Sequence, residues 1–290
     1  MKHLRSNLVL LAAALIWGCA FIAQSVGMRY IGPWTFDSVR CLIGGVTLFA
    51  ARRTILRGRK APLDRAALKG GLCCGLVLTF AMYTQQSGII YTTVGKAGFM
   101  TALYVILVPL LAMFTGKKVS GQVWAAACAA LAGFWLLSHP ENLSLGQGER
   151  RMLISAFLFA VHILVIDHFA PSTDGVLMSE IQFFTAGILS FLPMALLEKP
   201  SFASIAAAAA PVLYAGILSS GVAYTLQIIG QKDADPTVAT LLLSMEAVFA
   251  AAAGYVVLHE VLSRGELAGC VLVFAAVILA QVPLKRKEKI

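Results

Sequence analysis

Long apolar runs separated by short polar connections recur along the whole chain. A helix needs about 20 mostly apolar residues to cross a bilayer. On that basis the pattern predicts ten membrane-spanning helices, near residues 7–26, 34–51, 67–89, 94–115, 121–138, 151–169, 176–197, 207–230, 236–257 and 264–283. The connections are short, so consecutive helices are expected to run antiparallel.

Helix-start signals support these boundaries. Asp235 and Pro236 are typical of an N-cap followed by proline in the first turn, which predicts the start of the ninth segment. Ser263 and Glu266 have the spacing of a capping box at the start of the tenth. Within the fourth segment, Pro109 removes one backbone hydrogen bond and favours a kink.

The chain also repeats itself. Shifting it by 142 residues aligns the two halves without gaps, so that each predicted helix meets the one five places later. Three identities in the third and eighth segments are the least expected by composition: Ala81, Gln85 and Gly88 meet Ala223, Gln227 and Gly230. We therefore predict an all-α integral membrane fold with two five-helix repeats, residues 1–141 and 142–290.

Because five is odd, two such units have opposite orientations in the bilayer. An inverted-topology repeat of this kind is characteristic of secondary transporters, with their sites near the midplane. Near-equivalent halves give inward-open and outward-open states similar energies, which permits alternating access. The alternative is that duplication only doubled a stable bundle.

Composition agrees with a lipid environment. Hydrophobic residues make up 59% of the chain and charged residues only 13%, against about a quarter charged in soluble domains. The apolar run at 8–22 follows Lys2 and Arg5 like a cleavable signal, but the bulky Trp17 disfavours cleavage, so we expect it to remain as the first span.

Charge predicts the orientation. If the N-terminus is cytoplasmic, 16 of the 23 Lys and Arg residues lie on the inside, five lie outside and two lie within spans. The positive-inside rule then places both termini in the cytoplasm of a multi-pass protein of the cell's inner (plasma) membrane. The net charge of +9 is thus a topology signal, and no nucleic-acid partner is expected.

Four ordered motifs resemble a known family: LIWG at 15–18, FMTALYVILVP at 99–109, LSMEAVF at 243–249 and HEVLS at 259–263. With the ten predicted spans and the repeat, the chain resembles EamA-type members of the drug/metabolite transporter superfamily over essentially its whole length. The resemblance implies a central cavity lined mainly by helices 1, 3, 4, 6, 8 and 9. It also implies export or facilitated movement of small metabolites such as amino acids.

Polar groups within the spans are candidates for substrate binding or coupling, because they are costly in a membrane. Glu246 lies about ten residues from either end of its segment, roughly 15 Å from each surface; it could bind a substrate ammonium group, carry a coupling proton or be structural. Gln85 and Gln227 could bind polar groups or hold helices together. His162 could relay protons or be a satisfied neutral histidine.

Aromatic and charged residues complete the candidates. Trp17, Tyr83 and Tyr104 could line a cavity, although aromatic residues in bundles more often serve packing. Three charged residues are gate candidates: Asp37, Arg40 and Lys96. The first two share a helix face, which favours a simple pair over a gate near the outer mouth. Lys96 could snorkel to the interface or meet a substrate carboxylate. Glu180 is expected to be interfacial.

Other functions are less well supported. Six cysteines lie in apolar runs without metal-ligand spacing, and no P-loop pattern occurs, so neither a metal nor another cofactor is expected. The alternative function is a membrane-embedded enzyme acting on lipid-linked substrates, but such an enzyme would show clustered acidic or His groups at one membrane face. A channel or sensor is a further alternative. We expect a non-enzymatic transporter with a small-molecule substrate, and a homodimer is left open.

Overall fold

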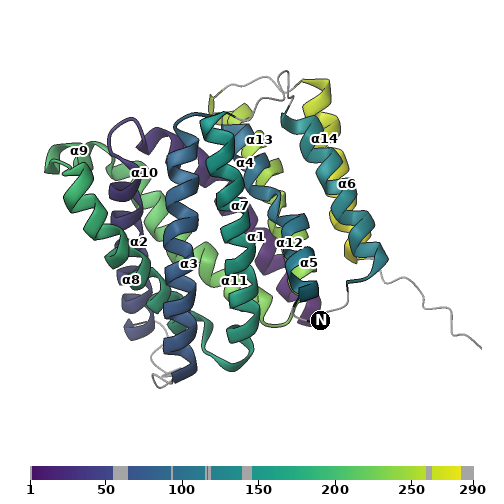
Figure 1. Ribbon diagram of the computed structural model, residues 1–290, viewed down its shortest axis with the longest axis horizontal. Coiled ribbons are helices and arrows are strands. Elements are labelled where there is room, and N and C mark those ends of the chain that lie inside the picture. The colour runs from purple at the N-terminus through teal and green to yellow at the C-terminus, as the bar shows by residue number, and fades with distance from the viewer. Residues whose placement is uncertain are drawn as a thin grey trace, which may run out of the picture.

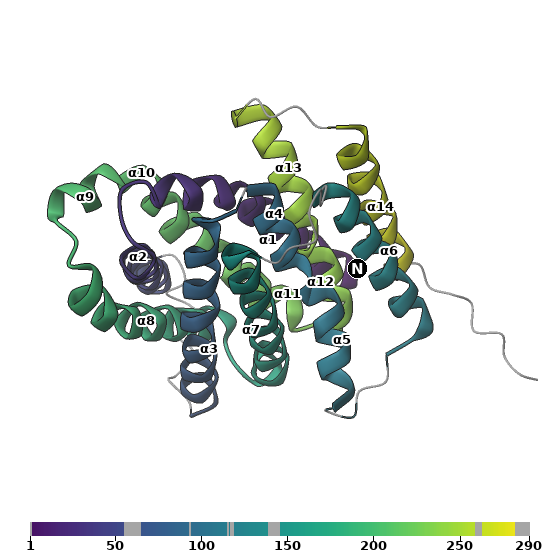
Figure 2. The same cartoon turned by 45° about the horizontal axis from the view of Figure 1, so that its top comes forward.

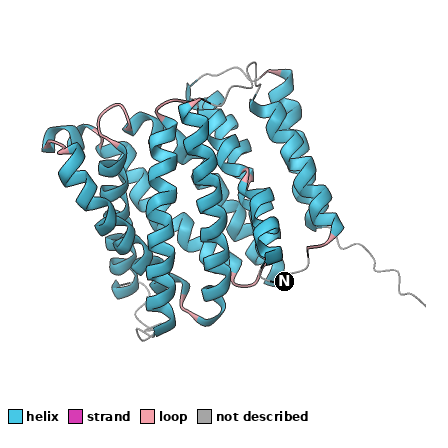
Figure 3. Cartoon of the chain, in the orientation of Figure 1, coloured by secondary structure: helices cyan, strands magenta, loops and turns pink. Residues whose placement is uncertain are grey.

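The computed structural model describes residues 2–54, 65–92, 94–114, 116, 119–138, 146–258 and 263–281. These residues form a bundle of helices joined by short connections, and they contain no β-strand (Figures 1 and 3). The first half contains α1 (Lys2–Gly27), α2 (Pro33–Thr54), α3 (Arg65–Ile89), α4 (Val94–Ala102), α5 (Tyr104–Phe114) and α6 (Gly121–Ser138).

The second half continues with a mixture of helix types. It contains α7 (Gln147–Phe169), the 3-10 helix η1 (Ala170–Ser172), α8 (Gly175–Pro193), the π-helix η2 (Met194–Glu198), α9 (Phe202–Ala207), α10 (Ala209–Leu213), the π-helix η3 (Tyr214–Ala223), α11 (Tyr224–Gln231), α12 (Pro236–Leu243), α13 (Met245–Leu258) and α14 (Arg264–Gln281). As the start signals predicted, α12 begins at Pro236 and α14 at Arg264.

Seven helices among the described residues are long and apolar enough to cross a membrane: Leu4–Gly27, Arg65–Ile89, Ala97–Phe114, Gln147–Ser172, Gly175–Glu198, Ala209–Gln231 and Val238–Val257. Two shorter apolar helices, Gly121–Gly133 and Leu267–Ala276, lie within α6 and α14. The 22-residue α2 is not among the seven. Its length is sufficient, but Asp37 and Arg40 lower its hydropathy.

Two of the predicted continuous helices are interrupted. One breaks at Leu103, between α4 and α5, and the other at Ser244, between α12 and α13. The first break lies at Leu103 rather than at Pro109, which stays inside α5. At both points a backbone N–H bonds three residues back, from Ile106 to Leu103 and from Ala247 to Ser244. At both points the backbone therefore tightens locally.

Helices from the two halves pack against each other throughout the bundle. Helix α1 packs on α13, α7 packs on α4 and α5, and α2 lies along α8. The pair α6 and α14 lies side by side at one edge of the bundle (Figures 1 and 2). The largest buried apolar cluster contains residues of both halves, for example Leu78 and Leu242. The core therefore forms between the halves rather than within each.

Polar contacts hold α2 at both of its ends. Glu198, at the end of η2, accepts hydrogen bonds from the backbone N–H groups of Trp34 at 2.9 Å and Thr35 at 2.7 Å, which caps the α2 N-terminus. At the other end, Arg52 donates two hydrogen bonds to Glu180, at 2.7 and 3.0 Å. The Glu180 side chain, expected to be interfacial, is buried within the protein in this pair, and its depth in the membrane stays a prediction.

Glycine allows the closest approach between α1 and α13. A Cβ atom built on Gly18 would lie 2.5 Å from Phe249 Cβ and 2.8 Å from the backbone oxygen of Glu246. Small residues at such crossings let helix backbones approach closely, and the van der Waals packing that results helps helices to associate in lipid. The absence of a side chain at Gly18 therefore helps to set the position of Glu246.

We expect Gly18→Ala to lower the free energy of unfolding in detergent by about 1–3 kcal/mol, because the added methyl group forces α1 away from α13. Gly95→Ala is the matched control, since a Cβ at Gly95 meets no atom within 4 Å. The control is expected to be neutral or slightly stabilising, as alanine is the better helix former. Chemical denaturation of both variants measures the difference; equal stabilities would contradict the close packing.

Candidate functional site

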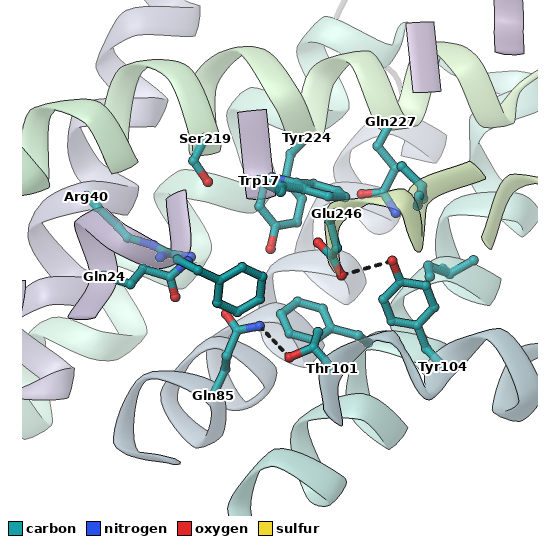
Figure 4. Close-up of a pocket in the computed structure, with 14 residues that line it drawn as sticks. Trp17, Gln24, Arg40, Gln85, Thr101, Tyr104, Ser219, Tyr224, Gln227 and Glu246 are labelled. Carbon is teal, nitrogen blue, oxygen red and sulfur yellow. Dashed lines mark hydrogen bonds between the residues drawn. The ribbon is translucent and has the colours of Figure 1, made fainter. Parts of the chain in front are cut away.

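A small cavity with both polar and apolar side chains in its wall lies at the centre of the bundle (Figure 4). Residues from both halves and from ten helical elements line it: Trp17, Phe21, Gln24, Arg40, Gln85, Thr101, Tyr104, Phe159, Ile163, Ser219, Tyr224, Gln227, Leu243 and Glu246. A buried cavity with a few convergent polar groups is typical of small-molecule sites.

A hydrogen bond between the two halves crosses this cavity. The Tyr104 hydroxyl donates to Glu246 Oε1 at 3.0 Å, and both side chains are buried (Figure 4). Each residue lies just after a helix interruption: Tyr104 begins α5, and Glu246 lies in the first turn of α13. The N-terminal turn of a helix favours a carboxylate through its unpaired N–H groups. The interruptions therefore place a donor and an acidic group opposite each other at mid-bundle.

Tyr104 and Glu246 are separated by 142 residues, which is the spacing of the predicted repeat. The same spacing relates four further pairs of cavity residues: Trp17 to Phe159, Phe21 to Ile163, Gln85 to Gln227 and Thr101 to Leu243. Each predicted half thus contributes five residues of the wall from equivalent positions. The chemistry of the two walls differs, however. The hydroxyl groups of Tyr104 and Thr101 in one half correspond to the carboxyl group of Glu246 and the alkyl group of Leu243 in the other.

The two predicted glutamines both line the cavity, but their surroundings differ. Gln85 donates from Nε2 to the Thr101 hydroxyl at 3.1 Å. The Gln227 Oε1 atom and the Trp17 Nε1 atom are buried and make no hydrogen bond with the part of the chain that the structure describes. Trp17 packs edge-on against Tyr224, with ring centroids 4.6 Å apart. Unpaired polar atoms facing a cavity can accept and donate to a ligand.

Arg40 and Asp37 pair as their spacing predicted, with Arg40 Nε 3.5 Å from Asp37 Oδ1. Simple pairing was the favoured interpretation, and a gate near the outer mouth stays a prediction. Arg40 also lines the central cavity together with Glu246 (Figure 4). The cavity therefore contains a basic group from α2 in the first half and an acidic group from α13 in the second.

Two other predicted site residues, His162 and Tyr83, do not line this cavity. His162 is buried behind Tyr224, with Nε2 3.1 Å from Gln182 Oε1. Tyr83 stacks on Trp34, with ring centroids 3.8 Å apart, and is not among the residues that line the cavity. Lys96 belongs to α4, but its side chain lies outside the described part of the structure.

Sequence reasoning did not select several residues of the cavity wall: Phe21, Gln24, Thr101, Phe159, Ile163, Ser219 and Leu243. Phe159 could have been predicted from the repeat, because the shift of 142 residues that pairs Gln85 with Gln227 also pairs Trp17 with Phe159. Ser219 gave no such signal. It reaches the cavity from the π-helix η3, and a wider turn of this kind is not evident from apolar periodicity.

Metal binding has no support in the described residues, where no three or more His, Cys, Asp or Glu residues are placed to hold an ion. The chemistry of the cavity is instead that of hydrogen bonds and opposite charges. Such a site can bind a small polar or charged molecule and exclude bulk water.

Outside the cavity the bundle is apolar, with many large hydrophobic side chains exposed on its outer faces. Apolar faces around a buried polar site define a multi-pass membrane protein with a small-molecule site. The sequence profile of the EamA-like transporter family matches residues 4–139 and 148–281. The chain therefore belongs to the EamA-like transporter family, which confirms the resemblance found in its motifs.

Individual relatives agree with this assignment. An uncharacterized transporter of Archaeoglobus fulgidus is 29% identical over 286 residues, covering 96% of this chain and 86% of that protein. The uncharacterized transporter YoaV of Bacillus subtilis is 21% identical, with 96% and 97% covered. A crystal structure of a protein with 21% sequence identity has a TM-score of 0.77 and covers 95% of this chain and 96% of that one, which shows a shared fold.

We expect Tyr104→Phe and Glu246→Gln to be energetically coupled. Tyr104→Phe removes the donor and should lower the free energy of unfolding by about 1–2 kcal/mol. In a double-mutant cycle with Glu246→Gln, the coupling should be about 1 kcal/mol. Tyr83→Phe with Glu246→Gln is the control pair, expected to add within about 0.5 kcal/mol. Additivity in the first pair would rule out the contact between the halves.

Proposed function

We propose that this protein is a secondary transporter that exports small metabolites, such as amino acids or related amphipathic compounds, by alternating access. The observation that carries the proposal is the central cavity, to which the two halves contribute five pairs of equivalent residues, with Tyr104 and Glu246 in contact. Membrane transport itself follows from the family. The substrate class, the direction and the alternating mechanism are the proposal.

The proposed architecture has ten spans in two repeats, residues 1–141 and 142–290. Seven long apolar helices, the two shorter ones in α6 and α14, and α2 together make ten. Contacts at both ends of α2 favour its insertion despite its low hydropathy, because they satisfy its first N–H groups and Arg52 within the protein. Each repeat then has an odd number of spans, so the repeats face opposite sides of the membrane.

Alternating access follows from such a pair of repeats. If each half can adopt the conformation of the other, exchanging the two conformations turns an outward-facing cavity into an inward-facing one. The cross-half contacts of α1 with α13, and of α7 with α4 and α5, are the interfaces that would change. The interrupted helices at Leu103 and Ser244 would provide the local flexibility, because their backbones leave regular α-helix beside the cavity.

Glu246 is proposed to bind an ammonium group of the substrate. Its carboxyl has one donor, Tyr104, among the described residues, so acceptor capacity remains for a ligand. Gln85 and Gln227 would bind further polar groups. His162 could act only indirectly, through Tyr224. We place the protein in the inner (plasma) membrane with both termini in the cytoplasm, from the distribution of basic residues.

Opposite orientation of the halves can be tested at equivalent exposed positions. Tyr30 and Ser172 are separated by 142 residues and both are exposed. In a cysteine-free background, Tyr30→Cys should react with an impermeant maleimide from outside intact cells, and Ser172→Cys only after permeabilisation. Tyr91→Cys is the same-side control for Tyr30. Labelling of Tyr30→Cys and Ser172→Cys from one side would contradict the inverted repeat.

We expect Glu246→Gln to reduce transport at least about tenfold, because the amide cannot offer a negative charge to an ammonium group. Reconstituted vesicles loaded with radiolabelled neutral L-amino acids measure counterflow. Glu149→Gln, at the start of α7 and outside the cavity, is the matched control and should retain wild-type rates. Unchanged rates in Glu246→Gln would remove Glu246 from the mechanism, and no wild-type flux would overturn amino acids as the substrate class.

A further inference from the structure

Arg40 has hydrogen-bonding capacity that the protein leaves unused. Its side chain lines the cavity and is 1% exposed, yet Nε and Nη1 make no hydrogen bond with any described residue. The nearest acidic atom, Asp37 Oδ1, is 3.5 Å from Nε. A charge-assisted hydrogen bond is about 2.7–2.9 Å long, so Asp37 neutralises part of the charge without satisfying the donors.

The same helix contains a second arginine that is well hydrogen-bonded. Arg52, at the end of α2, donates to both oxygens of Glu180 at 2.7 and 3.0 Å. Arg40 also has a carboxylate nearby, that of Asp37, but it lacks this two-point contact. Leaving a buried guanidinium without its hydrogen bonds is costly. A carboxylate entering the cavity would supply the missing acceptors, because its two oxygens match the guanidinium fork.

The positive charge in the cavity comes from one half alone. The repeat spacing places Gln182 at the position equivalent to Arg40, and Gln182 is bound to His162 away from the cavity. The negative charge, Glu246, comes from the other half, where its equivalent is the uncharged Tyr104. The near-symmetric cavity is therefore electrically asymmetric. Figure 4 shows Arg40 beside Gln24 on one side, with Glu246 towards Tyr104.

We propose that Arg40 binds the carboxylate of a zwitterionic substrate while Glu246 binds its ammonium group. The inference rests on the proposed transport function and narrows its substrate class. Apolar side chains, Phe21, Phe159, Ile163 and Leu243, form much of the remaining wall. These surfaces bury an apolar substituent rather than a polar one. The substrate class is thus an α-amino acid with an apolar side chain.

Four probes separate the contributions of the two charges: L-leucine, L-leucinamide, 4-methylpentanoate and 3-methylbutylamine. Binding to the purified full-length protein is measured by thermal shift, because ligand binding raises apparent stability. Leucine should bind about tenfold to a hundredfold more tightly than each probe that lacks one charged group. Wild-type protein that binds leucinamide as tightly as leucine, or that binds none of the probes, would overturn the inference.

Paired variants test Arg40 without leaving a lone buried charge. The double variant Asp37→Asn with Arg40→Gln removes both charges and should bind leucine no better than leucinamide. Asp37→Asn alone is the matched control; it frees Arg40 from its acidic neighbour and should keep or increase the preference for leucine. A double variant that folds, judged by its ligand-free melting transition, and still prefers leucine would overturn the role of Arg40. If the double variant does not fold, the comparison of the four probes on the wild-type protein still decides the inference.

Vesicle flux separates this inference from the proposed function. If wild-type vesicles transport 3-methylbutylamine as well as leucine, the zwitterion assignment fails while transport stands. If leucine binds with the expected preference but never crosses the membrane, the binding assignment stands and the transport proposal fails.

Discussion

A carboxyl group in the middle of an apolar bundle must find its hydrogen-bond partners inside the protein, because lipid offers none. Glu246 finds Tyr104, which belongs to the other half of the chain and lies 142 residues earlier. The partnership depends on two helix interruptions, at Leu103 and Ser244, that bring the start of α5 opposite the start of α13. Cross-half packing of α1, α7 and their partners then encloses the space around this hydrogen bond.

The same constraint explains α2, the most polar long helix of the bundle. Glu198 satisfies its first N–H groups, and Glu180 satisfies Arg52 near its last turn. With both ends held, the middle of α2 carries Arg40 to the cavity wall although its charge disfavours burial. Stability at the ends of the helix is therefore compatible with an incompletely paired arginine at its centre, which is the arrangement expected of a preorganised binding group.

The cavity combines nearly equivalent positions from the two halves with side chains that differ in charge. Equivalent positions supply Gln85 and Gln227 from the two halves, whereas Arg40 and Glu246 have uncharged equivalents. Near-equivalent backbones suit a conformational exchange between halves. Unequal side chains suit the recognition of a molecule whose own ends differ in charge, so one cavity can serve both requirements.

Much of the fold could be read from the sequence because apolar periodicity in lipid leaves the backbone few alternatives. The positions of the long helices, the starts at Pro236 and Arg264 and the EamA relationship followed from composition and motifs. The cavity residues Trp17, Gln85, Gln227, Tyr104 and Glu246 were also selected from the sequence, since polar and aromatic groups stand out in apolar segments.

Tertiary structure alone decided which of these residues meet. His162 and Tyr83 have the same local appearance as the residues of the cavity wall, but Gln182 and Trp34 engage them elsewhere. The partner of Glu246, the interruption of the fourth segment at Leu103 and the position of Arg40 on the cavity wall were not predicted. Each depends on contacts between segments far apart in the chain, and local sequence patterns specify helices and their apolar faces without specifying which faces meet.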